Sequence, residues 1–285
     1  MPAPETYTKL FLDGGDPAES RRALELLGRL DGQTTNPSLI AANPDIRARM
    51  ARGEKLAPDE ANGLYRRILL EIAEATAGPL SVEVYADAAS APDDLYRQAV
   101  VMARWIPNAY VKLPITAAGL ETAERVVAEG IRVNMTLCFT QEQAAAVYSA
   151  TKATRDPAFV SPFVGRYDDR GECGMDLIVN LLSTYAKGDG HVQTLTASVR
   201  TLDHLLYAFA LHSPLVTAPL KVYEAWAAAG FPAPDAKYTY PRGELKAIPY
   251  REVQLGRPWR EYDLQHDLTD VGLRKFAEAW NSLLR

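Results

Sequence analysis

The chain has 285 residues, 47% hydrophobic and 24% charged, with a formal net charge of −5. This length and ordinary composition suit one large globular domain with a sizeable buried core. The acidic balance argues against a general nucleic-acid-binding protein, although a local arginine cluster can still bind a small anion.

Short apolar segments with strand character alternate along the chain with longer helical patterns. The predicted strands cover residues 10–13, 34–36, 80–85, 110–115, 133–137, 159–164, 193–197 and 215–217. The predicted helices cover residues 17–30, 59–75, 92–104, 120–129, 141–150, 175–185, 202–210 and 220–229, and another begins at 43–45. Eight strands, most of them separated by helices, predict a parallel sheet closed into a (β/α)8 TIM barrel. An open doubly wound sheet would need a stronger glycine-rich loop than Gly14-Gly15.

The last part of the chain breaks this alternation. Residues 233–260 are rich in proline, tyrosine and charge and contain a short candidate strand at 246–250. An amphipathic helix then runs to residue 284 and carries Phe276, Trp280 and Leu283. Its apolar stripe favours packing on the barrel over a subunit contact or a lid. We therefore predict a catalytic barrel at 1–232 and a C-terminal extension at 233–285.

Cysteine content and hydropathy predict a cytoplasmic protein. Cys138 and Cys173 form neither a disulfide framework nor a zinc pattern and are expected as reduced thiols. The N-terminus lacks the basic and apolar regions of a signal peptide, and no apolar run is long enough to cross a bilayer.

A single lysine, Lys112, lies inside the apolar strand at 110–115. Lysine is almost never fully buried without a partner or a function. In a dry pocket desolvation favours the neutral amine, which can attack a carbonyl and form a Schiff base. The structural alternative is a lysine whose stem lies on apolar surface while its ammonium reaches water.

Further polar residues are expected near the C-terminal ends of the strands, where barrel active sites form. They are Asp13, Asn36, Glu83, Asn134, Thr136, Ser161, Arg166, Ser198 and Arg200. Together with Lys112 they place polar groups on seven strands, which is hard to explain by stability alone, because each would need a hydrogen-bond partner inside the core.

Each of these residues, taken alone, has a structural alternative. Asp13 could cap the tight turn that follows it, and Asn36 precedes a proline in a common turn pair. Glu83 could pair with an arginine in the barrel, and Thr136 has ordinary strand propensity. Arg166 could lie at the surface, paired with one of the aspartates that follow it.

Five short segments carry a more specific signal. They are TTNPSLI at 34–40, VKL at 111–113, NMTLCFT at 134–140, SPFVGR at 161–166 and ASVR at 197–200. In this order they resemble the signature segments of the transaldolase family, which belongs to the class I, Schiff-base-forming aldolase superfamily. The resemblance runs from about Leu10 to Pro219 and leaves the C-terminal extension outside it.

The resemblance implies a catalytic role for four residues. Lys112 would form a Schiff base with a ketose carbonyl, and the protonated imine would act as an electron sink for carbon–carbon cleavage. Asp13 would take the proton from the C4 hydroxyl. Glu83 and Thr136 would position a water that moves protons while the imine forms and hydrolyses. No metal or organic cofactor is implied, because the lysine supplies the electron sink.

The resemblance also implies how the substrate is held. Asn36 and Asn134 would hydrogen-bond the hydroxyls of the dihydroxyacetone unit. The residues expected around the phosphate are Arg166, Arg200, Ser161 and Ser198. Guanidinium suits phosphate because it binds in a bidentate way, and its charge would also disfavour an ammonium on Lys112.

Two positions favour group transfer over simple aldol cleavage. Fructose 6-phosphate aldolases of this fold typically carry Gln where this chain has Glu83, and Tyr where it has Phe163. A tyrosine hydroxyl would help to move a water proton and release free dihydroxyacetone, which Phe163 cannot do. One departure is Gly14, where many relatives have Thr or Ser, so a hydrogen bond near Asp13 is expected to be missing.

The sequence therefore predicts a transaldolase that moves a dihydroxyacetone unit from sedoheptulose 7-phosphate or fructose 6-phosphate to erythrose 4-phosphate or glyceraldehyde 3-phosphate. The alternatives on the same fold are a fructose 6-phosphate aldolase and a transaldolase for another anionic ketose, such as a sulfonated one. An alternative of a different class is a non-catalytic sugar-phosphate-binding barrel. The expected partners are phosphorylated sugars, with no nucleic acid or membrane, and homo-oligomer formation is left open.

Overall fold

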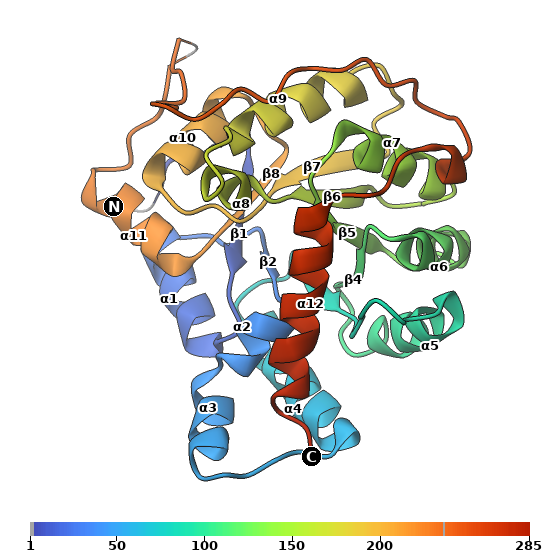
Figure 1. Ribbon diagram of the computed structural model, residues 1–285. Helices are drawn as coiled ribbons and strands as arrows, with labels where there is room; N and C mark the ends of the chain where they lie inside the picture. Colours follow the sequence, from blue (N-terminus) through green and yellow to red (C-terminus); the bar gives the residue numbers. More distant parts are fainter. Residues whose placement is uncertain (1–2, 236) are drawn as a thin grey trace.

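The centre of the molecule is a closed sheet of eight parallel strands that follow one another in chain order, with β1 paired to β8 (Figure 1). The computed structural model describes residues 3–235 and 237–285. The strands are β1 Lys9–Asp13, β2 Gly32–Thr34, β3 Leu80–Glu83, β4 Ala109–Pro114, β5 Val133–Cys138, β6 Ala158–Pro162, β7 Val192–Thr196 and β8 Leu215–Ala218. The predicted (β/α)8 TIM barrel is confirmed.

Helices surround the barrel. They are α1 Pro17–Leu27, α2 Pro37–Ala41, α3 Pro44–Ala51, α4 Pro58–Ala73, α5 Pro92–Met102, α6 Ala117–Ala128, α7 Gln141–Ala150, α8 Val164–Asp168, α9 Gly174–Tyr185, α10 Leu202–Ala210, α11 Leu220–Ala228, the 3-10 turn η1 Trp259–Glu261 and α12 Asp267–Asn281. Helices α1 to α5 all begin with proline, whose missing N–H would have no partner in a first turn anyway. In the part of the chain described here, no helix is both long and apolar enough to span a bilayer.

Two local predictions were wrong. The second strand, predicted at 34–36, ends at Thr34, and the chain after it forms the helix α2. This helix forms because Asn36 caps it, its Oδ1 accepting a hydrogen bond of 2.9 Å from the Leu39 N–H. The candidate strand at 246–250 is reduced to one bridge between Glu172 and Lys246. Pro249, which has no N–H, cannot extend a ladder there.

Aromatic rings fill the N-terminal end of the barrel. Tyr110 and Phe159 stack with ring centroids 4.3 Å apart, and Phe11 meets Phe159 edge-on at 6.1 Å. Leu195 and Leu215 complete this cluster. Because this end is filled by apolar side chains, the polar residues of the strands gather toward the C-terminal end.

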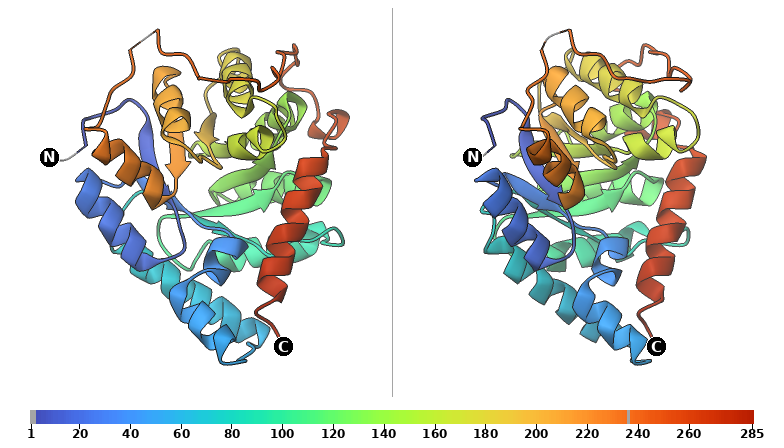
Figure 2. Two further views of the ribbon diagram at one scale, coloured as in Figure 1. Left: turned by 60° about the vertical axis from the view of Figure 1, so that its left-hand side comes forward. Right: turned by 90° about the vertical axis from the view of Figure 1, so that its left-hand side faces the viewer.

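The last helix, α12, lies across the C-terminal end of the barrel, from the end of β5 to α4 (Figure 1). In Figure 2 the same helix forms a separate layer along one edge of the molecule. Trp280 packs on the ring of Tyr65 in α4, with centroids 5.9 Å apart. The chain end then pairs with Leu56, whose N–H donates to Leu283 and whose carbonyl accepts from Arg285. The C-terminal extension is therefore attached at both ends of α12.

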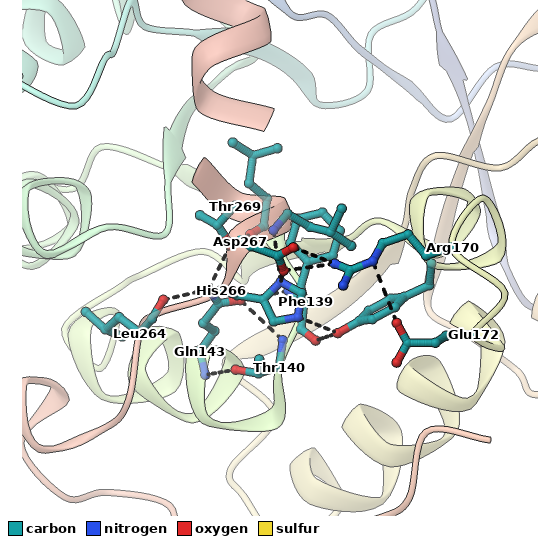
Figure 3. A network of polar contacts seen from close by, with 12 residues as sticks. Phe139, Thr140, Gln143, Arg170, Glu172, Leu264, His266, Asp267 and Thr269 are labelled. Atoms are coloured by element: carbon teal, nitrogen blue, oxygen red, sulfur yellow. Dashed lines mark hydrogen bonds and ion pairs between the residues drawn. The ribbon is translucent and has the colours of Figure 1, made fainter. Parts of the chain in front are cut away.

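A buried glutamine anchors the start of α12 (Figure 3). Gln143 Oε1 accepts hydrogen bonds from the N–H groups of Phe139 and Thr140, at 2.7 and 3.2 Å. Its Nε2 donates to the Leu264 carbonyl at 2.8 Å and to Thr269 Oγ1 at 2.9 Å. One side chain thus joins the end of β5, the start of α7 and the start of α12.

The same anchor supports a strained residue in β5. Leu137 is buried with φ of 63°, a left-handed conformation that costs a residue with a Cβ roughly 1–2 kcal/mol. The strand bulges there, between Thr136 and Cys138. Thr269 Oγ1 donates to the Leu137 carbonyl at 3.0 Å and so satisfies the bulged backbone. The orientation of Thr136 therefore depends partly on α12.

Replacing Gln143 by leucine should destabilise the protein. The Gln143→Leu variant leaves buried N–H and C=O groups without partners, and we expect the free energy of unfolding to fall by about 3 kcal/mol in urea. Gln265, the exposed residue directly before His266, is a matched control. Gln265→Leu should change the free energy of unfolding by less than about 0.5 kcal/mol. Equal effects of the two variants would contradict this description of the anchor.

Candidate active site

A cavity of about 230 Å³ opens at the C-terminal end of the barrel, beneath α12. Most residues predicted for the site line it, namely Asp13, Asn36, Lys112, Ser161, Phe163, Arg166, Ser198 and Arg200. The other three, Glu83, Asn134 and Thr136, are buried and are not part of the cavity wall. The structure therefore brings the predicted residues to one end of the barrel, in two layers.

The centre of the site is a buried ion pair. Lys112 Nζ lies 2.9 Å from Glu83 Oε2 and donates to the Thr35 carbonyl at 3.2 Å. The two residues face each other in register on β4 and β3, and each side chain is 4% exposed. Burial raises the pKa of Glu83, while the charge of Lys112 opposes that rise. Lys112 therefore does not place its amine in bulk water.

Tyr65 on α4 hydrogen-bonds the backbone of Glu83. The Glu83 N–H donates to the Tyr65 hydroxyl at 3.0 Å, and that hydroxyl lies 2.6 Å from Thr35 Oγ1. Because Thr35 Oγ1 donates to the Ser81 carbonyl, Tyr65 must be the donor toward Thr35. Tyr65 was not predicted as a site residue, because an aromatic residue on an amphipathic helix has only the pattern of core packing.

Asp13 ends β1 beside two threonines. Its Oδ1 accepts a hydrogen bond of 2.8 Å from Thr34 Oγ1, which lies 2.6 Å from Thr217 Oγ1. Burial raises the pKa of Asp13, while Lys112 and the Thr34 hydrogen bond lower it. Thr34 thus supplies a hydrogen bond near the carboxylate where Gly14 cannot. The Gly14 N–H itself donates to the Thr34 carbonyl.

A polar layer lies inside the barrel behind the cavity. Asn134 Nδ2 donates to Ser81 Oγ at 3.0 Å, and Asn134 Oδ1 accepts from Ser161 Oγ at 2.7 Å. Thr136 Oγ1 is buried and has no hydrogen-bond partner among residues 3–235 and 237–285. A buried hydroxyl without a partner is unusual, so Thr136 is free to hydrogen-bond a small polar molecule.

The two arginines approach the cavity differently. Arg166 lies between the rings of Phe163 and Phe276, at 4.9 and 5.4 Å from their centroids, and its Nη1 is buried with no described partner. Burial lowers the pKa of Arg166. Arg200 is half exposed and forms a bidentate pair with Asp169, at 2.8 and 3.1 Å. Arg166 therefore has the freer donors for an anion.

Backbone geometry shapes the wall between the arginines. Ser198 has φ of 58°, and its carbonyl accepts a hydrogen bond of 3.1 Å from the Gly165 N–H. A Cβ on Gly165 would lie 2.4 Å from the Ser198 carbonyl oxygen, so only glycine permits this approach. The Ser198 strain and Gly165 together bring the end of β7 against α8.

Several cavity residues were not predicted. They are Thr34, Ser38, Leu39, Ala197, Thr217, Lys275 and Phe276. The first three belong to the segment 34–40, where only Asn36 received a role. Lys275 and Phe276 come from α12, and nothing in the extension's own sequence indicates which end of the barrel it covers.

No group of three His, Cys, Asp or Glu residues suited to a metal ion occurs within 3–235 and 237–285. The polar groups at the C-terminal end of the barrel are two amines, two carboxyl groups, hydroxyls, amides and guanidinium groups.

The family model described as Transaldolase/Fructose-6-phosphate aldolase matches residues 10–285. The chain belongs to this family. Because the match includes α12, the expectation that the resemblance ends near Pro219 was wrong. The C-terminal extension is part of the family's pattern.

Similar curated proteins carry the name probable transaldolase. The chain is 38% identical over 272 residues to that of Brucella ovis, covering 95% of this chain and 96% of the relative. It is 36% identical over 216 residues to that of Herpetosiphon aurantiacus, covering 76% and 86%. It is 32% identical over 276 residues to that of Dehalococcoides mccartyi, covering 96% and 99%.

Among solved structures, the chain is similar to a Rubisco-like protein from Rhodopseudomonas palustris, with a TM-score of 0.49, 14% identity, and coverage of 81% and 66%. It is also similar to the tryptophan synthase A-subunit from Pyrococcus furiosus, with a TM-score of 0.46, 13% identity, and coverage of 81% and 94%. At these values neither likeness bears on function.

Removing the Tyr65 hydroxyl should destabilise the site. In Tyr65→Phe the buried Glu83 N–H loses its acceptor and Thr35 loses its donor, so the free energy of unfolding should fall by about 2 kcal/mol. Tyr7 is 72% exposed, and Tyr7→Phe should leave stability unchanged within about 0.5 kcal/mol. If urea titrations give Tyr65→Phe the same free energy of unfolding as the wild type, the hydroxyl does not support Glu83.

Proposed function

We propose that the chain is a transaldolase that carries a dihydroxyacetone unit on Lys112. The observation that supports this most is the Lys112–Glu83 pair, in which an amine that lines the cavity lies 2.9 Å from a carboxyl group buried behind the cavity wall. Schiff-base formation needs a nucleophilic amine and a group that accepts and returns protons, and this pair supplies both. Both side chains are buried, so neither forms a surface ion pair.

In the proposed first step, the Lys112 amine attacks the ketose carbonyl carbon. One proton leaves the nitrogen and reaches the former carbonyl oxygen through a water at the Thr136 hydroxyl, which gives a carbinolamine. A second proton, donated by the protonated Glu83, allows this hydroxyl to depart and leaves Glu83 as a carboxylate. Water leaves and a protonated imine remains. Burial raises the pKa of Glu83, so its protonated form persists to higher pH than in a free glutamate and the group can donate a proton here and regain it when the imine is hydrolysed.

In the second step, Asp13 takes the proton from the C4 hydroxyl. The C3–C4 bond breaks, its electron pair moves into the imine to give an enamine, and the aldose leaves. The enamine then attacks the aldehyde carbon of an acceptor aldose, and Asp13 returns its proton to the new hydroxyl. Hydrolysis of the imine releases a ketose three carbons longer than the acceptor aldose and restores Lys112.

The anionic end of the sugar would meet Arg166, which lines the cavity and takes part in no ion pair within the described residues. Phe163 lines the wall and offers no hydroxyl to a water near the imine. The intermediate should therefore persist until an acceptor aldehyde arrives. A sulfonated ketose would present an anion to the same guanidinium, so turnover of phosphorylated and sulfonated donors distinguishes the two.

Turnover tests the proposal directly. With fructose 6-phosphate and erythrose 4-phosphate, the wild type should form a seven-carbon ketose phosphate, detected by mass spectrometry. Lys112→Met should lower the rate at least about a thousandfold, because the nucleophile is lost. Lys221, an exposed lysine on α11, is the matched control, and Lys221→Met should retain wild-type turnover.

Other outcomes would favour the alternatives. Release of free dihydroxyacetone without an acceptor would indicate an aldolase, and turnover of a sulfonated ketose alone would change the donor. If no ketose is cleaved although fructose 6-phosphate binds, the chain is a sugar-phosphate-binding barrel.

The pH dependence of turnover should report the buried carboxyl groups. Asp13 must be ionised to act as a base, and burial raises its pKa, so kcat/KM should fall with decreasing pH above the ordinary aspartate value of about 4. Asp13 and Glu83 both approach Lys112, so the apparent pKa belongs to the coupled groups. Asp13→Asn should lower kcat and weaken this acid limb. A rate that stays constant down to about pH 4 would contradict the proposed base.

A further inference from the structure

The cavity contains a cation that comes from α12. Lys275 and Phe276 are the residues of this helix that line the cavity, which Arg166 and Arg200 also line. Lys275 is exposed, and within the described residues its ammonium takes part in no ion pair. It is therefore a free charge at the cavity.

We propose that Lys275 is a third cationic contact for the anionic group of the sugar substrate, so that α12 forms part of the substrate site. The inference deepens the proposed function and rests on it for the identity of the substrate. Nothing in the resemblance, which was drawn from residues 10–219, pointed to this residue.

The packing of α12 places Lys275 on the correct side of the helix. A Cβ on Gly272 would lie 2.3 Å from Arg166 Nη1, so the helix backbone passes directly over this guanidinium. Phe276 contacts the same guanidinium through its ring. Residues three and four apart are neighbours on a helix surface, so Lys275 and Phe276 both lie next to Gly272, one on each side of it.

The charge distribution gives Lys275 a function. A sugar phosphate carries between one and two negative charges near neutral pH. Arg200 is already paired with Asp169, which leaves Arg166 as the arginine with free donors. A lysine on a flexible four-carbon stem can add charge and can follow a phosphate whose position changes with sugar length, which a confined guanidinium cannot do.

The neighbouring residue on the helix provides a matched control. Arg274 is also exposed and cationic, but it lines a different hollow beside Tyr85, Asp87 and Glu278. The two residues therefore differ in the direction that they face rather than in their charge. A general effect of positive charge on α12 would appear in both variants, and a contact with substrate only in one.

The test compares a phosphorylated donor with the same sugar lacking phosphate. In Lys275→Gln, the ratio of kcat/KM for fructose 6-phosphate to kcat/KM for fructose should fall about tenfold, mainly through KM for the phosphorylated donor. Lys275→Arg should retain most of this ratio, and Arg274→Gln should keep the wild-type ratio. The KM of the wild type should rise more steeply with salt than that of Lys275→Gln.

Two results would overturn the inference. They are a ratio within twofold of wild type in Lys275→Gln, and an equal fall in Arg274→Gln. If the wild type turns over no ketose phosphate, the proposed function fails separately. Calorimetric titration with fructose 6-phosphate then tests Lys275 by itself, with about tenfold weaker binding expected in Lys275→Gln and unchanged binding contradicting the contact.

Discussion

The buried pairing of Lys112 with Glu83 is the interaction on which the rest of the site depends. An isolated ammonium or carboxylate costs several kcal/mol to bury, so each partner needs the other and needs further hydrogen bonds. Register between β3 and β4 places them face to face, and Tyr65 and Thr35 hold the surrounding backbone. Burying this pair lowers stability. In return, the proposed chemistry has an amine at the cavity with a proton-transferring carboxyl group beside it.

The C-terminal extension completes this arrangement from outside the barrel. Thr269 satisfies the bulged backbone at Leu137, and Gln143 joins the start of α12 to β5. Gly272 then allows the helix backbone to lie over Arg166. The helix that hydrogen-bonds the strand bulge thus also lines the cavity, and it lies within the segment that the family model matches.

Local sequence signals predicted the barrel and the position of Lys112, because alternation and a lone lysine in an apolar strand depend on neighbouring residues alone. The helix α2 was missed because Asn36 before a proline suits both a turn and a helix cap. The pairing of Arg200 with Asp169 and the position of Lys275 depend on contacts between distant segments. No spacing rule contains that information, so these parts of the site needed the structure.

Chemical trapping of the intermediate tests the central claim most directly. The protein is incubated with fructose 6-phosphate, reduced with borohydride, digested and mapped by mass spectrometry. The account predicts a dihydroxyacetone-sized adduct on the peptide that contains Lys112, which disappears when erythrose 4-phosphate is added before the reductant. An adduct on another lysine, or dihydroxyacetone transfer that proceeds with no trapped adduct, would contradict it.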